Sequence, residues 1–413
     1  MSEARPLTLG PGAQGPTAAP FARILAVAVL STSLSLIPPL LVGSLVVFLR
    51  TDLEFDEQGL GLASAAFFAS AAVVSVPAGR LVQRLGPRTA VLIGAAGSAT
   101  ALLGIALVAQ SWLALVGFLC LGGLAVALSQ PAADLTLAKG VSSGRQGVAF
   151  GAKHAAGSLA VLLAGLAVPG LGVTLGWRWA FALVALLAVP VAILVPRDLS
   201  GAASRARVDR GGDPPVRGLV VLSVAAGLAS GAANAASAFL VAYAVDAGVA
   251  TSIAGLLLTI GGAMGGTSRV FMGWLADRRA GRHFAVCTAL VATGALGYLI
   301  LAFASHAVTF AVGSILALGV GWSWHGLFVY AIVRSNQSAP AAATGIAHAG
   351  PFVGGVAAPI ALGTATVHFG FRPAWLGLSG AAVLAAGLMA LGAGMLQEDV
   401  RGHAEASAAP SPV

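Results

Sequence analysis

The feature that most constrains this chain is a series of long apolar segments separated by short polar breaks. A membrane hydrocarbon core about 30 Å thick requires roughly 20 apolar residues per helix. Division at the charged and Pro/Gly-rich breaks therefore predicts a polytopic, all-α membrane protein with 12 transmembrane helices. The predicted spans are 23–49, 59–79, 88–109, 112–135, 147–169, 178–196, 218–243, 252–273, 284–304, 308–333, 341–367 and 373–396.

The composition agrees with a lipid environment. Of 413 residues, 58% are hydrophobic and 9% charged, and the mean hydropathy is +0.93, whereas soluble domains carry roughly 25% charged residues. A formal charge of +8 would suit nucleic acid, but the basic residues lie scattered between apolar segments without interleaved aromatics. We therefore expect the bilayer as a partner and no nucleic acid. Cys120 and Cys287 lie within apolar segments and are interpreted as small buried hydrophobes.

The polar breaks divide the chain into two halves. Residues 1–22 have no periodicity and are predicted to be a disordered cytoplasmic N-terminus, and the first apolar segment has no cleavage site that would make it a signal peptide. A six-helix bundle is expected over 23–196, a cytoplasmic linker over 197–217, a second six-helix bundle over 218–396, and a disordered tail over 397–413.

The distribution of Lys and Arg predicts the orientation, because cytoplasmic loops retain these residues. Loops after even-numbered segments hold fourteen of them, and loops after odd-numbered segments hold only Arg50, Arg178 and Arg372. We therefore expect both termini in the cytoplasm. The excess of Arg over Lys and the abundance of Ala, Gly and Val indicate a bacterial genome, so we expect a bacterial-type plasma (inner) membrane.

A short basic sequence motif occurs twice, as GRLVQRLGPR at 79–88 and GWLADRRAGR at 273–282, at an offset of 194 residues. Agreement at one constant offset indicates two parallel repeats of six helices, related by an axis along the membrane normal. The same offset pairs Asp52 with Asp246, Gly61 with Gly255, Ser129 with Ser323, Gly151 with Gly345, His154 with His348, Gly176 with Gly370 and Arg178 with Arg372.

Twelve helices in two parallel halves, with a Gly-x-Leu-x-x-Arg loop after the second and eighth helix, resemble the major facilitator superfamily of secondary transporters. The second copy of the loop has Asp277 where the family motif has its acid, and the first copy has Gln83. The resemblance implies a gating role, although such arginines also serve simply to retain loops in the cytoplasm. The gating candidates are Gly79, Arg80, Gln83, Arg84, Arg88, Arg269, Gly273, Asp277, Arg278 and Arg282.

Few ionisable residues fall inside the predicted spans, and each costs several kcal/mol there unless it faces a cavity or a partner. They are Asp134, Lys153, His154, Arg269, His325 and His348. Asp134 and Lys153 are almost equidistant from the loop that joins helices four and five, so they should lie at similar depth and form a salt bridge. That pair would be structural or would take part in coupling or substrate contact.

The remaining candidates for a substrate or proton pathway are histidines and neutral polar residues. His154 and His348 are repeat mates that would flank one pathway and carry protons, or would pack as neutral rings. The resemblance implies that helices one, four, seven and ten line the cavity, which adds Gln130, Asn234, Trp322 and His325. Arg269 would be a structural or gating partner, or would bind a substrate anion.

These features predict a secondary active transporter that works by alternating access. No phosphate-binding loop, metal-ligand spacing or arrangement of nucleophile and base is present, so we expect no ATP-driven transport, no metal, no cofactor and no enzyme. The mostly cationic interior favours a small anionic or polar organic solute, coupled to protons, and a monomer. One alternative is a proton-driven exporter of multidrug or amphipathic compounds, which GPFVGG at 350–355 favours. Another is a non-transporting membrane sensor.

Overall fold

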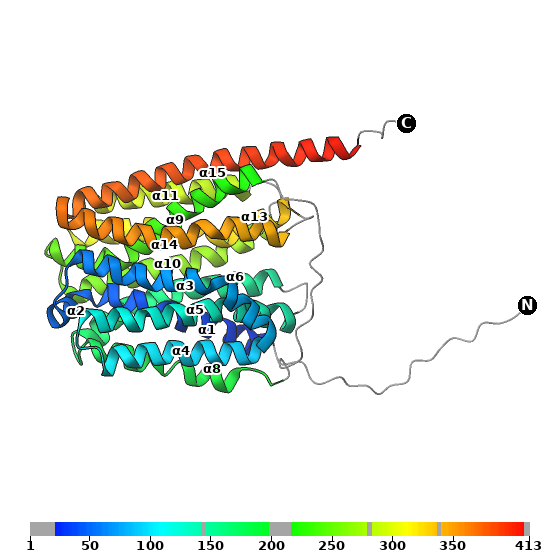
Figure 1. Ribbon diagram of the computed structural model, residues 1–413. Helices are drawn as coiled ribbons and strands as arrows, with labels where there is room; N and C mark the ends of the chain where they lie inside the picture. The colour runs from blue at the N-terminus through cyan, green and yellow to red at the C-terminus, as the bar shows by residue number, and fades with distance from the viewer. Residues whose placement is uncertain (1–20, 142–145, 198–215, 279–282, 337–339, 409–413) are drawn as a thin grey trace, which may run out of the picture.

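The computed structural model describes residues 21–141, 146–197, 216–278, 283–336 and 340–408, and in these ranges its regular structure is helical. Figure 1 shows the helices side by side as a single bundle, with the first half of the chain below and the second half above. The predicted N-terminal segment 1–22, apart from its last two residues, and most of the predicted linker 197–217 lie outside the described residues.

Each predicted span contains helix. In the first half the helices are α1 (Phe21–Ser44), α2 (Val46–Leu53), α3 (Glu57–Leu85), α4 (Pro87–Leu107), α5 (Trp112–Gly140), α6 (Gln146–Ala167) with its π-helical extension η2 (Val168–Gly172), α7 (Trp177–Ala185) and α8 (Ala188–Leu194). In the second half they are α9 (Val216–Asp246), α10 (Thr251–Arg278), α11 (His283–Ala302), α12 (Ala307–Ser314), π-helical η4 (Ile315–Val320), α13 (Trp324–Ser335), α14 (Pro340–Phe369) and α15 (Phe371–Ala408).

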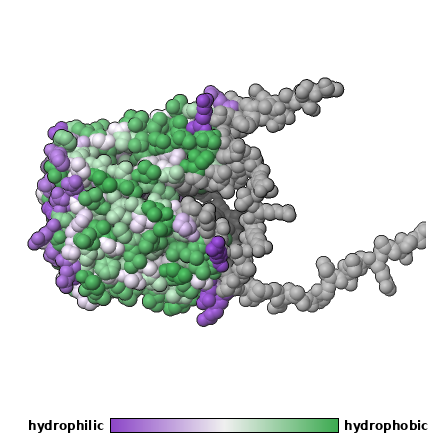
Figure 2. Space-filling view, viewed as in Figure 1, coloured by the Kyte–Doolittle hydropathy of each residue, from purple (hydrophilic) through white to green (hydrophobic). Residues whose placement is uncertain are grey.

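The exposed surface of the bundle is that of a membrane protein. Eleven of the described helical segments are long and apolar enough to cross a bilayer. The twelfth, α10, has 28 residues and is less apolar, because it contains several glycines and hydroxyl side chains. Figure 2 shows a hydrophobic band around the middle and hydrophilic residues toward the two ends. The prediction of 12 transmembrane helices is confirmed.

The last helix extends beyond its predicted membrane span. We expected a disordered tail over 397–413, but α15 continues without interruption to Ala408. The residues that follow Leu396 begin Gln-Glu-Asp-Val-Arg, and Gln, Glu and Arg are good helix formers. A helix can therefore extend beyond the apolar segment that defines its membrane part.

Equivalent helices of the two repeats make equivalent contacts within their own halves. α1 packs against α6 as α9 packs against α14, and α4 packs against α7 as α11 packs against α15. Between the halves, α3 packs against α14 and α6 packs against α10. The 194-residue offset relates α3 to α10 and α6 to α14, so these two interfaces are equivalent under the repeat. The prediction of parallel repeats is confirmed.

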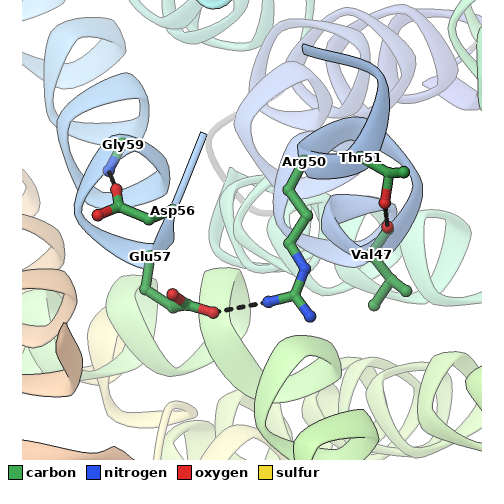
Figure 3. Close-up of polar contacts among 6 residues, drawn as sticks. All are labelled: Val47, Arg50, Thr51, Asp56, Glu57 and Gly59. Atoms are coloured by element: carbon green, nitrogen blue, oxygen red, sulfur yellow. Dashed lines mark hydrogen bonds and ion pairs between the residues drawn. The ribbon is translucent and has the colours of Figure 1, made fainter. Parts of the chain in front are cut away.

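One end of the bundle carries the α2–α3 connection, and we call it the α2 end; the opposite end, where α1 begins and α15 ends, is the termini end (Figure 1). At the α2 end, Arg50 Nη1 lies 2.7 Å from Glu57 Oε1 in a salt bridge. Asp56 caps α3, because its Oδ1 accepts a hydrogen bond from the Gly59 backbone N at 2.8 Å (Figure 3). Such a cap satisfies a backbone donor that the first turn of a helix leaves unpaired.

The two halves come into backbone contact near the α2 end. A Cβ on Gly61 of α3 would overlap the Pro359 carbonyl group of α14, and a Cβ on Gly255 of α10 would lie 2.8 Å from the Gly165 carbonyl oxygen of α6. These two contacts are repeat mates. Toward the termini end, a Cβ on Gly79 of α3 would have no described atom within 4 Å. The interior between the halves is therefore closed at the α2 end.

Replacement of Gly61 by valine should prevent this closure, because the overlapping atom belongs to the Pro359 backbone and cannot rotate away. We expect a cost of about 1–3 kcal/mol from overpacking and a longer distance between spin labels at Gln58 and Phe369 in a cysteine-free background. Gly380→Val is the control, since no atom lies within 4 Å of a Cβ there. Equal distance distributions in the two variants would contradict the backbone contact.

Candidate functional site

A cavity of about 80 Å³ lies between the two halves, which is room for several water molecules. Helices α1, α3, α6 and α9 and the broken helix α12–η4–α13 contribute its walls. The lining residues are Leu36, Pro39, Leu40, Ser64, Phe68, Gly157, Asn234, Ala238 and Trp322. Most of this lining is apolar, so the cavity suits a ligand with an apolar body and few polar groups.

Two polar side chains in the lining are available to a ligand. The Ser64 hydroxyl is buried without a hydrogen-bond partner among the described residues, and the Asn234 amide makes no hydrogen bond to another described residue. A buried polar group without a partner costs about 1–3 kcal/mol. Binding of a polar ligand group here would recover part of that cost.

The cavity lies where the tenth membrane helix is broken. The π-helical segment η4 ends at Val320, and the chain passes through a turn at Gly321–Ser323 before α13 begins. The repeat mates of Gly319 and Gly321 are Ala125 and Ala127, which lie inside the continuous helix α5. Neither glycine has room for a Cβ, which would lie 2.8 Å from Met264 Cβ at Gly319 and 2.3 Å from Gly294 Cα at Gly321. The two glycines therefore let α10 and α11 pack closely against this helix beside the break.

The break exposes a backbone carbonyl group to Arg269 of α10. Its Nη2 donates to the Trp322 carbonyl oxygen at 3.1 Å, and its Nη1 donates to the Ser158 hydroxyl of α6. The guanidinium carbon also lies 5.0 Å from the centroid of the Trp322 ring, a cation–π contact. Arg269 therefore links the first half of the chain to the second, directly beside the cavity.

Gly157 leaves the path between the cavity and this guanidinium open. It lines the cavity, and a Cβ at this position would lie 3.8 Å from Arg269 Nη1 and 3.9 Å from Leu36 Cδ1. Arg269 is only partly buried. A ligand in the cavity can therefore approach the positive charge past Gly157.

No carboxylate among the described residues forms a salt bridge with Arg269. Of the 14 acidic residues, only Asp134 falls in the interior of a predicted span, and its Oδ1 already lies 2.6 Å from Lys153 Nζ. A positive charge at membrane depth is normally balanced by a partner. The site therefore combines an apolar cavity with a cation that has no counter-charge among the described residues.

The predicted salt bridge between Asp134 and Lys153 is confirmed. The Lys153 side chain is 4% exposed and that of Asp134 is 45% exposed, so the lysine depends on its partner for compensation. Gln130 lies one turn before Asp134 on α5, and its Nε2 is buried without a partner among the described residues. Gln130 does not line the cavity, whereas the candidates Asn234 and Trp322 do.

Two of the candidate histidines contact each other, and the predicted flanking of one pathway by His154 and His348 stays a prediction. His154 of α6 lies against His325 of α13, with ring centroids 5.7 Å apart and planes inclined at 48°. The side chain of His348, the repeat mate of His154, lies outside the described residues. His154 thus contacts a residue of the other half that is not its symmetry equivalent.

Little of the two basic loops is described. Arg84 is exposed, and Arg88 Nε is buried without a partner among the described residues. The side chains of Arg80, Gln83, Asp277 and Arg278, the surroundings of Gly273, and all of Arg282 lie outside the described residues. The gating role of these loops stays a prediction.

The fold and the site define a polytopic helical membrane protein with two repeated halves around a central cavity. A family model described as "Major Facilitator Superfamily" matches residues 24–336, and the chain belongs to this superfamily of membrane transporters. It is a secondary transporter. Among curated proteins, no relative matches the chain.

Two solved structures share the fold. A D-xylose-proton symporter superposes with a TM-score of 0.68 at 19% identity, covering 89% of this chain and 97% of its own. A bacterial homologue of the human lysosomal transporter Spinster, in an inward-facing and occupied conformation, superposes with a TM-score of 0.67 at 15% identity, covering 92% and 98%. At these identities the likeness concerns the fold.

The buried ion pair gives a stability prediction. Asp134→Asn should lower the apparent melting temperature by several degrees, because it leaves the buried Lys153 ammonium group without a counter-charge. The double variant Asp134→Asn/Lys153→Met should recover most of the loss. Glu57→Gln, which breaks the more exposed pair with Arg50, should cost at most about 1 kcal/mol. A double variant as unstable as the single one would show that uncompensated charge is not the cause.

Proposed function

We propose that this transporter carries small organic anions that have one anionic group and an apolar body, together with protons. The observation that carries the proposal is the Arg269 guanidinium, which has no carboxylate partner among the described residues and lies beside a mainly apolar cavity. The anionic group would bind Arg269 past Gly157, and the apolar body would pack against Leu40 and Phe68. Asn234 would hydrogen-bond a polar atom of the solute.

Lys153 is the other interior cation that an anion could bind, and its contacts disfavour it. That ammonium group is buried and is already paired with Asp134 at 2.6 Å, so an anion would have to displace an internal carboxylate to reach it. Arg269 needs no such exchange, because its present acceptors are a hydroxyl and a carbonyl oxygen. A charged acceptor on a guanidinium forms a stronger hydrogen bond than a neutral one.

The proposal includes sidedness and setting. With the arginine-rich loops in the cytoplasm, the termini end faces the cytoplasm and the closed α2 end faces outward, so the cavity is closed toward the outside. The Spinster homologue with the same fold is described as inward-facing and occupied, which is compatible with this orientation. We place the protein in a bacterial-type plasma membrane as a functional monomer.

An exporter of amphipathic drugs is the second candidate, and the apolar lining favours it. A lipophilic cation would, however, meet Arg269 without any described carboxylate in the lining to balance it. A sensor that binds but does not transport would share the anion site. Uptake of labelled butyrate into proteoliposomes separates the sensor from the transporter.

Binding can be tested with matched probes of equal shape and different charge, namely butyrate, butyramide and butylammonium. At about 100 times its dissociation constant a ligand stabilises the native state by roughly 2.7 kcal/mol, which a thermal-shift measurement detects. We expect stabilisation by butyrate or a longer carboxylate alone, and its loss in Arg269→Gln. Stabilisation by butylammonium that Arg269→Gln leaves unchanged would favour the drug exporter.

The route past Gly157 has its own test. Gly157→Leu should abolish the thermal shift from butyrate, because the side chain would fill the space between the cavity and Arg269 Nη1. Gly157→Ala should keep it, since a Cβ there makes only ordinary contacts of 3.8 and 3.9 Å. Gly151→Leu on the same helix is the control, because no atom lies within 4 Å of a Cβ at that position. Butyrate binding that survives Gly157→Leu would rule this route out.

A further inference from the structure

Two imidazoles meet across the interface between the halves. His154 belongs to α6 in the first half and His325 to α13 in the second, and their ring centroids are 5.7 Å apart. Both residues are partly buried. Histidine is the side chain whose ordinary titration range lies nearest to neutral pH, so such a pair can gain or lose a proton under physiological conditions.

The pair lies one helical turn from the Arg269 contacts. His154 precedes Ser158 by four residues on α6, and His325 follows Trp322 by three residues along the tenth membrane helix. Ser158 and Trp322 are the two residues that Arg269 binds. At 1.5 Å per residue the imidazoles are displaced by about 5–6 Å toward the termini end.

The charges that the structure describes around the imidazoles are mostly positive. Arg269 approaches from α10, and Lys153 next to His154 is paired with Asp134 of α5. Farther toward the termini end, Arg334 of α13 bonds Tyr330, against which His283 of α11 packs. On the part of α14 toward the termini end the titratable residue is His348, whose side chain lies outside the described residues. Among the described residues, then, Arg269 is the nearest charge without a counter-charge.

We propose that the His154–His325 pair is the proton-binding site that couples transport to the proton gradient, and this inference rests on the anion site proposed above. Without an anion, the positive charge of Arg269 disfavours a second positive charge one turn away. A bound anion cancels the charge of Arg269, and one imidazole nitrogen then takes up a proton from solution through its lone pair. The bound anion and the bound proton together carry no net charge.

The coupling is reciprocal by thermodynamic linkage. If the anion favours proton binding, the proton favours anion binding by the same factor. Because the two imidazoles belong to different halves, the pair exists only while α6 and α13 are in contact. Separation of the halves at this level would divide the pair and release the proton to water together with the anion.

Asp134 is the competing proton site, and its contacts disfavour it. Its carboxylate lies 2.6 Å from Lys153 Nζ, and the lysine side chain is only 4% exposed. Protonation of Asp134 would leave a buried ammonium group uncompensated, which is costly. Both partners also lie in the first half of the chain, so their contact does not depend on how the two halves are arranged.

Calorimetry of the full-length protein can count the protons. Butanesulfonate is the probe, because it stays ionised throughout the range and any proton taken up belongs to the protein. Titrations between pH 6 and 8, in buffers with different ionisation enthalpies, should show uptake approaching one proton per anion. Over part of this range the Kd for butanesulfonate should rise about tenfold per pH unit, as expected for one linked proton.

The variants His154→Gln and His325→Gln should bind butanesulfonate with little proton uptake and a Kd that hardly varies with pH. His368→Gln is the matched control, because this exposed histidine bonds Thr364 in its own helix. His154 and His325 lie on different helices, so if one glutamine variant fails to fold, the other can still be measured. His154→Asn is a second substitution at the same position for that case.

The outcomes separate the two proposals. If neither butanesulfonate nor butyrate binds the wild-type protein, the anion site itself is wrong. If the anion binds without proton uptake, or if uptake persists in both glutamine variants, the anion site stands and the histidine pair is not the proton site. Loss of uptake in the histidine variants but not in His368→Gln supports the coupling site.

Discussion

The structure depends on direct backbone contact between its two halves. In a bilayer no hydrophobic force drives one helix against another, so association relies on close packing at small residues. The contacts of Gly61 with Pro359 and of Gly255 with Gly165 are such places, and the repeat relates one to the other. They close the α2 end and leave the cavity between the halves farther along the bundle. A larger side chain at either contact would force the two helices that meet there apart.

The chemistry of the site depends on one local departure from regular helix. Backbone polar groups at membrane depth must be satisfied inside the protein, and the turn after η4 satisfies this rule through Arg269, which binds the Trp322 carbonyl oxygen. The same guanidinium binds Ser158 in the other half. A single break in a helix thus holds a positive charge beside the cavity and ties that charge to the relative position of the halves.

Much of the fold could be predicted from the sequence, because segment length, Lys/Arg distribution and a constant repeat offset are local or periodic signals. The Asp134–Lys153 pair was predictable for the same reason, since equal distances from one loop place two residues at equal depth. The contact between His154 and His325 was not, because it depends on how the halves are rotated against each other. Gly157 and Ser158 gave no signal, being small and uncharged, and their importance comes from Arg269, a distant residue in the chain.

The repeats share a scaffold but not a site. The 194-residue offset places Ser75 opposite Arg269, Leu128 opposite Trp322 and Leu40 opposite Asn234, so the charge, the indole and the amide all belong to the second half. In return the first half supplies Leu36, Pro39, Leu40 and Phe68 to the cavity wall. A solute with one anionic end and one apolar end would therefore touch both halves with different chemistry. Because each half would hold a different part of such a solute, its binding would favour arrangements in which both halves reach the cavity. That is the condition for moving a solute by a change in the relative position of the halves.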